Sequence, residues 1–368
     1  MNSCAQEVKQ MKKLIKVVVT GAGSPGAAGV IKALRKVSDR NIHIIGLDAS
    51  PTAVGRAMVD RFYHIPEATD QAFTRTVLDI CKRESADVIL PLVTKELFKF
   101  AEHKTLFDNK GTSVSVSDYE KLVIANNKGR LLEELAQAGF DAPRYRIIKT
   151  VEELDEAIRE LGYPDNPVCF KPTLSNGSRG FRVLDPSKDR ALLLFSEKPN
   201  STYISITDLF DVLKHATRIP EMVVMEYLPG QEYSVDLLAD QGKVLTAIPR
   251  LREAMVGGIT TRGVVVHEQP IIDYASQIVN HLGLHGNIGV QVRLDCNNKP
   301  KILEINPRIQ GTIIHCVGAG VNLPYLAVKL ALGIESEPEE LAVKWGTRMT
   351  RYWEEIFYDV DGFPYSLQ

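Results

Sequence analysis

The sequence predicts an α/β protein whose first part is a parallel sheet of the Rossmann type. Three β-rich stretches alternate there with helical patterns, in the order strand, helix, strand, helix, strand. This order and spacing indicate parallel strands joined by right-handed crossovers. From Pro167 onward the pattern changes to short strands separated by glycine-rich turns. The strands predicted in the first part span 14–20, 42–48 and 87–91.

This change of pattern divides the chain into two predicted domains. Residues 1–13 are polar and are expected to form a flexible N-terminus, followed by a Rossmann-like domain at 14–124 and a second domain at 125–368. The helices expected in the second domain span 128–138, 151–161, 271–282 and 324–332. Its strands are predicted at 143–148, 168–171, 181–184, 223–225, 234–239, 244–249, 288–294, 301–305 and 347–352.

The composition indicates an ordinary globular protein. Of 368 residues, 44% are hydrophobic and 24% are charged, which excludes a disordered, collagen-like or coiled-coil chain. The balance of 44 Lys and Arg against 46 Asp and Glu argues against nucleic acid or an anionic membrane as the main partner. No apolar run approaches the roughly 18 residues of a membrane span, and the N-terminus lacks the pattern of a signal peptide. Five scattered cysteines without a CxxC pair indicate reduced thiols, so we expect a cytoplasmic protein.

A glycine motif lies between the first predicted strand and the helix that follows it. Gly21, Gly23 and Gly26 spell GxGxxG, and Asp48 ends the next strand. This spacing is typical of a dinucleotide-binding site and supports an NAD(P)-dependent oxidoreductase as one alternative. Pro25, however, removes one amide donor from the turn. A glycine turn that only packs the strand against the helix explains the same pattern.

Polar residues alternate along the two predicted strands on either side of residue 297. If the turn is centred between Asn297 and Asn298, Gln291 lies directly opposite Glu304. Strand alternation then gives a polar face of Gln291, Arg293, Glu304 and Asn306, and a core face of Val290, Val292, Leu303 and Ile305. Oxygen donors with few carboxylates suit Mg²⁺ shared with substrate phosphates, whereas a solvated hairpin face explains the same residues without a metal.

Lys171 lies within an apolar strand, directly before a loop of small residues. A buried ammonium group needs an anionic partner, and the backbone amides of such a loop can surround phosphate groups. The alternative is an edge-strand lysine before a flexible turn. The loop residues in question are Ser175, Gly177, Ser178 and Gly180.

A further candidate site lies in the segment 223–236, where a strand runs through a Pro-Gly turn into a second strand that carries acidic residues. The end of a strand offers backbone groups to the edge of an adenine, and a nearby carboxylate can accept hydrogen bonds from ribose hydroxyls. A plain β-turn with solvated acidic residues explains the same sequence without a nucleotide.

Taken in order, these motifs resemble the ATP-grasp superfamily. The resemblance is carried by Lys128, by Lys171 with the loop 175–180, and by 226–236, Gln291 and 304–308. The chain is most similar to one synthetase half of the carbamoyl-phosphate synthase large subunit, over about residues 12–332. The resemblance implies an α/β ATP-grasp fold preceded by a Rossmann-like (pre-ATP-grasp) domain. It also implies a mobile lid subdomain at about 165–227.

The resemblance implies a role for each residue that matches a motif. The implied ATP-binding residues are Lys128, Lys171, Ser175, Gly177, Ser178, Gly180, Glu226, Tyr227, Leu228 and Glu232. The implied ligands of two Mg²⁺ ions, with Mn²⁺ as an alternative ion, are Gln291, Glu304 and Asn306. Lys171 and Arg308 are implied to be catalytic, since Arg308 would steady the transferred phosphoryl group or the acyl phosphate.

The chain also departs from carbamoyl-phosphate synthase. It contains one ATP-grasp unit and no recognisable regulatory domain, and its residues 309–312 differ from the serine-rich loop of the synthase. The segment with Arg250, Arg252 and Arg262 looks more like the substrate-side loop of stand-alone carboxylate–amine ligases. Two or three arginines there could clamp a carboxylate, so Arg262 joins the catalytic candidates. The alternative is a solvated charged loop.

We therefore expect an ATP- and Mg²⁺-dependent ligase. It would phosphorylate a carboxylate to an acyl phosphate and join that to an amine, a reaction that requires mainly positioning and charge neutralisation. The alternatives are the oxidoreductase described above and a nucleotide-binding protein without turnover. The expected partners are a small-molecule carboxylate and amine, without nucleic acid or membrane, and a homodimer is one oligomeric option.

Overall fold

The computed structural model describes residues 14–365 except 176, 178, 197–201 and 361, and for Ser196 the backbone alone. The predicted N-terminal segment 1–13 lies outside the described residues. The chain forms two compact units, which are described separately: unit 1 comprises 1–117, 308–343 and 353–368, and unit 2 comprises 118–307 and 344–352. This division differs from the predicted domain ranges because the late segment 308–343 belongs to the first unit.

Unit 1 contains the predicted parallel sheet, with the strand order β3-β2-β1-β4-β5. Each neighbouring pair is parallel, which confirms the predicted α/β class. The middle of β1 is buried on both faces, and this is why it reads as a continuous apolar run. The strands are β1 (Leu14–Thr20), β2 (Asn41–Asp48), β3 (Arg61–His64), β4 (Val88–Leu90) and β5 (Ser113–Val114).

Unit 1 also contains helices that lie between these strands in the sequence, and further elements from late segments of the chain. The early ones are α1 (Ala27–Arg35), α2 (Phe73–Glu84), α3 (Thr94–Glu102), α4 (Lys104–Asp108) and the 3₁₀ turn η1 (Val54–Ala57). The late segments supply α11 (Ile314–Gly318), α12 (Leu323–Ala331), η2 (Pro338–Leu341), β16 (Phe357–Tyr358) and β17 (Pro364–Tyr365). No helix in the described ranges is long and apolar enough to cross a membrane.

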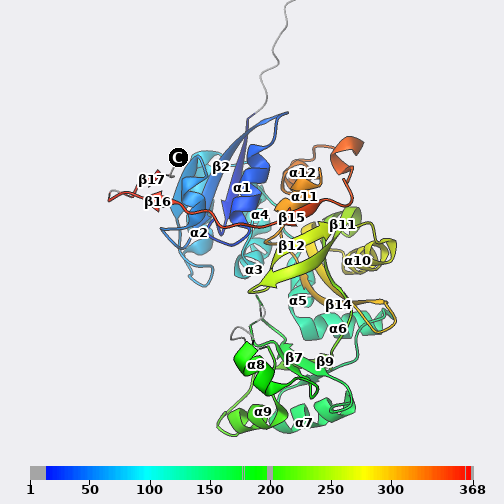
Figure 1. The fold of residues 1–368 in the computed structure, drawn as a ribbon. Coiled ribbons are helices and arrows are strands. Elements are labelled where there is room, and N and C mark those ends of the chain that lie inside the picture. Colours follow the sequence, from blue (N-terminus) through cyan, green and yellow to red (C-terminus); the bar gives the residue numbers. More distant parts are fainter. Residues whose placement is uncertain (1–13, 176, 178, 197–201, 361, 366–368) are drawn as a thin grey trace, which may run out of the picture. The chain divides into compact units, whose positions relative to one another are not determined.

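Unit 2 contains two antiparallel sheets. The larger has the strand order β14-β13-β10-β11-β12-β15, and the smaller has the order β6-β9-β7-β8. Figure 1 labels β11, β12, β14 and β15 of the larger sheet and β7 and β9 of the smaller. The strands of the larger sheet are β10 (Glu232–Asp240), β11 (Lys243–Val256), β12 (Ile259–Val265), β13 (Gly286–Leu294), β14 (Pro300–Asn306) and β15 (Arg348–Thr350). The strands of the smaller sheet are β6 (Tyr145–Ile148), β7 (Val168–Pro172), β8 (Arg182–Leu184) and β9 (Met222–Glu226).

Helices cover the apolar faces of these two sheets. They are α5 (Tyr119–Asn126), α6 (Lys128–Gln137), α7 (Val151–Glu160), α8 (Arg190–Ser196), α9 (Ile206–Leu213) and α10 (Gln269–Leu282). One core of unit 2 joins α6 and α10 to the buried residues of β10, β13 and β14, and a second core lies between α7, α9 and the smaller sheet. Gly283 ends α10 in a left-handed conformation with φ +63°, which confirms the predicted helix end.

The predicted hairpin between β13 and β14 forms, but its turn differs from the prediction. Asn298 alone has a positive φ, +58°, and the Asp295 amide donates to the Lys299 carbonyl, so the turn is not centred between the two asparagines. A register shift between Gln291 and Val292 then adds one residue on β14. The two deviations cancel, and Gln291 lies opposite Glu304 as predicted.

The same β-bulge corrects the predicted core face of β14. Leu303 is half-buried, whereas Ile302 is fully buried and pairs with Val292. Leu303 is the additional residue of the bulge, because the register passes from Ile302 directly to Glu304. A bulged residue leaves the ladder, so its carbonyl group is available for another donor.

Candidate functional site

The candidate site lies on one face of the larger sheet of unit 2, which we call the polar face. Glu304, Gln291, Ser234 and Arg250 form one row across four strands, because each is in register with the next. Residues paired in this way share a face of an antiparallel sheet. Strand alternation adds the remaining members of the polar face: Glu232, Asp236, Arg252, Arg293 and Asn306. The opposite face carries Tyr233, Val235, Val290 and Ile305, which belong to the core.

Two buried lysines lie near Glu304 at the β14 end of the polar face, and one of them pairs with its carboxylate. Lys128 Nζ lies 3.4 Å from Glu304 Oε2 and donates to the Ser175 carbonyl at 2.6 Å. Lys171, on the smaller sheet, donates through Nζ to the carbonyl of Leu303 at 2.9 Å. The acceptor is the carbonyl that the bulge removes from the ladder. Both lysines that the sequence predicts for ATP phosphates are therefore brought together between the two sheets of unit 2.

Burial and charge act against each other in this cluster. Burial lowers the pKa of Lys171, and the negative charge of Glu304 opposes this, while the positive charge of Lys128 adds to it. Burial would raise the pKa of Glu304, but the charges of Lys171 and Lys128 outweigh it and hold that pKa below its usual value. The charges of two ammonium groups thus act on one carboxylate, and this excess of positive charge favours a further anion.

The loop after Lys171 has the backbone conformation that only glycine adopts readily. Gly177 has φ +63° and Gly180 has φ +77°, and a Cβ at Gly180 would lie 2.6 Å from Pro172 Cδ. Ser175 Oγ donates to the Pro172 carbonyl at 3.2 Å. Ser178, another predicted phosphate-binding residue, lies outside the described residues.

The predicted adenine segment follows β9. The carboxylate of Glu226 accepts from Arg144 through both oxygens, from N at 2.9 Å and from Nε at 3.1 Å. Its side chain is therefore engaged, and it is the backbone of this segment that could face a base. Tyr227 accepts a hydrogen bond at 3.0 Å from Arg293, whose guanidinium lies 4.8 Å from the tyrosine ring centroid, and Leu228 is buried.

Two ion pairs on the polar face involve residues that sequence reasoning did not pair. Arg252 donates through Nη1 to Glu232, the predicted ribose ligand. Arg250 donates through Nε to Asp236, and both side chains are almost completely buried. The signal in the sequence is the alternation of Glu232 and Asp236 along β10, but it gives no partner until the register with β11 is known.

Arg262 does not join these arginines. Gly263 pairs with Arg252, so the neighbouring Arg262 points to the opposite face of β12. Its Nε lies 3.8 Å from Glu253, which also accepts from Arg348 Nη1 at 2.6 Å. The structure thus places Arg262 in an exposed ion-pair group away from the polar face.

The predicted metal ligands come together, since Gln291 is in register with Glu304 and Asn306 Nδ2 donates to Glu304 Oε1 at 3.3 Å. Within the described ranges, no group of three or more His, Cys, Asp or Glu side chains is arranged to hold a metal ion. The set offers one carboxylate and two amide oxygens. Such hard but sparse donors fit Mg²⁺ that takes its other ligands from nucleotide phosphates and water.

Arg308, the last residue predicted from the motif, belongs to unit 1. Its Nε donates to Thr94 Oγ1 at 3.1 Å and its Nη1 to the Ile309 carbonyl at 2.9 Å. These contacts fix the guanidinium beside the start of α3, at the carboxyl end of the parallel sheet. Its role toward a phosphoryl group stays a prediction.

The glycine motif of unit 1 is explained by close packing. A Cβ at Gly21 would lie 2.4 Å from Val93 Cγ2, and a Cβ at Gly26 would lie 2.9 Å from the Cα of Gly311. Asp48 Oδ2 accepts from the Gly23 amide at 2.7 Å, so this carboxylate is bonded to the turn itself. The geometry does not support the oxidoreductase alternative, which needs that acid for a ribose.

Two family models match separate parts of this chain. Residues 218–354 match the family described as "ATP-grasp in the biosynthetic pathway with Ter operon", and residues 17–115 match "PylC-like, N-terminal domain". The first range contains most of the polar face, and the second contains the parallel sheet.

Curated relatives and solved structures are similar over most of the chain. A formate-dependent phosphoribosylglycinamide formyltransferase of Wolinella succinogenes is 25% identical over 312 residues, which are 81% of this chain and 71% of the relative. A carbamoyl phosphate synthase large chain of Clostridium perfringens is 22% identical over 365 residues, 89% of this chain. The match spans only 31% of that large chain.

Two solved structures show the same fold. The match to an ADP complex of N5-carboxyaminoimidazole ribonucleotide synthetase has a TM-score of 0.66 and 17% sequence identity. It covers 90% of this chain and 80% of the chain in that structure. The match to a biotin carboxylase from Campylobacter jejuni has a TM-score of 0.66 and 15% sequence identity. It covers 91% of this chain and 74% of the chain in that structure. The chain therefore contains an ATP-grasp domain that follows a PylC-like N-terminal domain.

Proposed function

We propose that this protein is an ATP- and Mg²⁺-dependent ligase that activates a carboxylate as an acyl phosphate and joins it to an amine. The observation that carries the proposal is that Lys128 pairs with Glu304 while Lys171 is held on the neighbouring Leu303 carbonyl, where the charge of Glu304 acts on it. Relatives whose names describe carboxylate or one-carbon chemistry support it.

In the first step the carboxylate oxygen attacks the γ-phosphorus of ATP, an acyl phosphate forms, and ADP leaves. Lys128 and Lys171 bind the phosphates, exchanging their present carbonyl and carboxylate contacts for phosphate oxygens. Because both ammonium groups are held by the fold, they neutralise charge in the transition state with little reorganisation. Mg²⁺, when bound by Glu304, Asn306 and Gln291, supplies further neutralisation of the phosphate charge. We propose two such ions, with Mn²⁺ as a substitute.

In the second step the amine attacks the acyl carbon, phosphate leaves and the nitrogen loses a proton. The proposed substrates are a small-molecule carboxylate and a small-molecule amine. Arg308 is proposed to bind the acyl phosphate, and the segment 165–227 is proposed to move as a lid over the nucleotide. Cytoplasmic location and a homodimer belong to the same proposal.

Thermal unfolding with nucleotides tests the binding part of this proposal. A ligand at about 100 times its Kd stabilises the fold by ~2.7 kcal/mol, which raises the Tm by a few degrees. We expect this increase with ATP and with ADP, each with Mg²⁺, and no increase with NAD. An increase with NAD and none with ATP would contradict the proposal. ADP release that depends on an added carboxylate then tests turnover.

A further inference from the structure

The two lysines of the candidate site come from separate elements of unit 2, and one residue connects their backbones. Lys128 begins α6, and Lys171 lies near the end of β7. The amide of Lys128 donates to the carbonyl of Thr173 at 3.0 Å, and only Pro172 separates Thr173 from Lys171. Because the ring of Pro172 restricts the backbone, this connection is short and stiff.

The glycine after Lys128 shows how closely α6 approaches this segment. Gly129 lies in the first turn of α6, where glycine is less favourable than alanine. A Cβ at Gly129 would lie 3.1 Å from Thr173 Cγ2 and 3.0 Å from Ile147 Cδ1. The backbone of α6 therefore packs directly against the methyl group of Thr173. The methyl group limits how near the start of α6 comes to β7, and the hydrogen bond limits how far it withdraws.

The hydroxyl group of Thr173 fixes the orientation of that methyl group. Thr173 is 3% exposed, and its Oγ1 donates to Glu221 Oε1 at 3.0 Å. The amide of Thr173 donates to the carbonyl of Glu221 at 3.0 Å. Glu221 directly precedes β9, the strand beside β7 in the smaller sheet. A buried hydrogen bond to a carboxylate is among the stronger ones, so this side chain is held in one conformation.

We propose that Thr173 is a positioning residue for the two phosphate-binding lysines. Its side chain and carbonyl set the separation of the Lys128 and Lys171 backbones, so that both ammonium groups reach the same phosphates. Lys171 is also held by the pairing of β7 with β9, so a change at Thr173 displaces Lys128. A displacement of about 1 Å is enough to weaken such charge contacts strongly. This inference rests on the proposed function and adds to it a residue outside the predicted motifs.

The test measures the affinity for MgADP by calorimetry, so it needs no acceptor substrate. Thr173→Val removes the hydroxyl group and nearly keeps the shape, whereas Thr173→Ser keeps the hydroxyl group. The matched control is Thr112→Val in unit 1. Thr112 is 1% exposed, and its hydroxyl group donates to the carbonyl of Ala86 at 2.8 Å. Thermal unfolding first shows that each variant of the full chain is folded.

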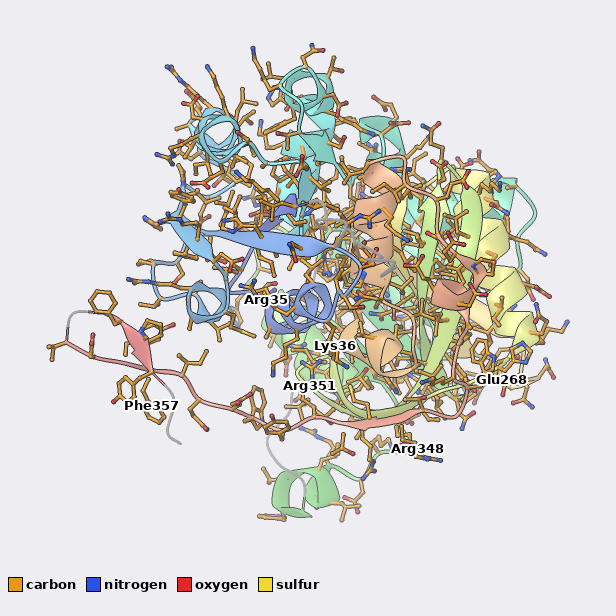
Figure 2. The ribbon with its side chains drawn as sticks, turned by 90° about the horizontal axis from the view of Figure 1, so that it is seen from above. Arg35, Lys36, Glu268, Arg348, Arg351 and Phe357 are labelled. Carbon is orange, nitrogen blue, oxygen red and sulfur yellow. The ribbon has the colours of Figure 1, made fainter. Side chains whose placement is uncertain are left out.

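A double-mutant cycle with Lys128→Met separates positioning from a general loss of stability. If Thr173 acts through Lys128, Thr173→Val should have little effect on affinity once that ammonium group is absent. Arg348→Ala controls for the loss of a positive charge elsewhere in unit 2. The side chain of Arg348 is 70% exposed and is labelled in Figure 2.

We expect Thr173→Val to weaken MgADP binding about 10-fold, and Thr173→Ser about threefold or less. Thr112→Val and Arg348→Ala should stay within about twofold of the wild-type affinity, as should Thr173→Val relative to Lys128→Met alone. If Thr173→Val does not fold, Glu221→Ala removes the partner of the hydroxyl group and takes its place in the cycle, with the same expectation.

Two outcomes would overturn the inference alone. One is an unchanged affinity when the hydroxyl group or its partner is removed from a folded protein. The other is an equal loss of affinity with and without the Lys128 ammonium group, because Thr173 would then act on stability in general. If the wild-type protein binds neither MgADP nor MgATP, the proposed function itself fails.

Discussion

Replacing Glu304 with glutamine removes the carboxylate that pairs with Lys128 and whose charge also acts on Lys171, while nearly preserving the size of the side chain. In the wild-type protein Lys128 Nζ lies 3.4 Å from Glu304 Oε2, and Lys171 is held on the adjacent Leu303 carbonyl. Without the carboxylate the two positive charges face each other in a site that is mostly closed to water. We expect Glu304→Gln to lower the free energy of unfolding and to remove the Mg²⁺-dependent part of ATP binding.

The magnitude follows from the distance and the exposure. Two unit charges 3.4 Å apart interact with about 5 kcal/mol at an effective dielectric constant near 20 and about 1 kcal/mol in bulk water. The Lys128 side chain is 7% exposed and the Glu304 side chain 23%, so the pair lies between these limits. Removing one partner of such a pair leaves an uncompensated charge, and we expect a loss of about 3 kcal/mol.

Urea unfolding followed by circular dichroism measures this loss, with and without MgATP. The control is Glu253→Gln, because Glu253 pairs with Arg262 and Arg348, whose side chains are 64% and 70% exposed. That change should cost less than about 1 kcal/mol. Equal losses in the two variants, together with an unchanged effect of Mg²⁺ on ATP binding by Glu304→Gln, would refute the reasoning.

The pH dependence of the same variant has a definite sign. The lysine charges hold the pKa of Glu304 below its usual value, so its contribution to stability is present above the unfolded-state pKa. The contribution is lost as the pH falls through the lower pKa of the folded state. The difference in unfolding free energy between wild type and Glu304→Gln should therefore be constant near neutral pH and shrink in acid.

Three further predictions concern other parts of the molecule. Burial raises the pKa of Glu96 to about 7, so the wild-type protein should lose up to about 3 kcal/mol of stability between pH 4.5 and 7. Glu96→Gln should not show this loss. Measurement of the unfolding free energy as a function of pH checks both expectations. Gly26→Ala should lower the Tm by several degrees through the close Gly311 backbone without changing the MgATP-induced shift; a lost shift would implicate the turn in binding. Lys171→Met should keep the fold by circular dichroism yet lose carboxylate-dependent ADP release; retained release would contradict its role.

Much of the sheet architecture can be predicted from the sequence because buried strands have recognisable patterns. β1 is a continuous apolar run since both its faces are covered, and β13 alternates because one face is polar. The sequence correctly predicts that Gln291 lies opposite Glu304, but the turn position assumed in that prediction is wrong. The turn and the bulge each shift the register by one residue, in opposite directions. Neither shift can be recognised from the residue types in the sequence.

The remaining parts of the site depend on contacts between distant segments. The pairing of Asp236 with Arg250 requires the register of β10 and β11, and the sequence predicts β11 only as far as residue 249. β12 was missed altogether. That β15 joins the far edge of the same sheet also depends on a contact between distant segments. Periodicity within one strand carries no such information.

Transfer of oxygen from the carboxylate to phosphate tests the central claim most directly. Once a stimulating carboxylate is found, it is supplied with ¹⁸O in both oxygens, together with MgATP and the amine, and the released phosphate is analysed by mass spectrometry. Formation and breakdown of an acyl phosphate place one carboxylate oxygen in each phosphate, so we predict one ¹⁸O atom in each phosphate released. Phosphate without ¹⁸O, released at the same rate as product, would show that the carboxylate is not phosphorylated and would contradict the account.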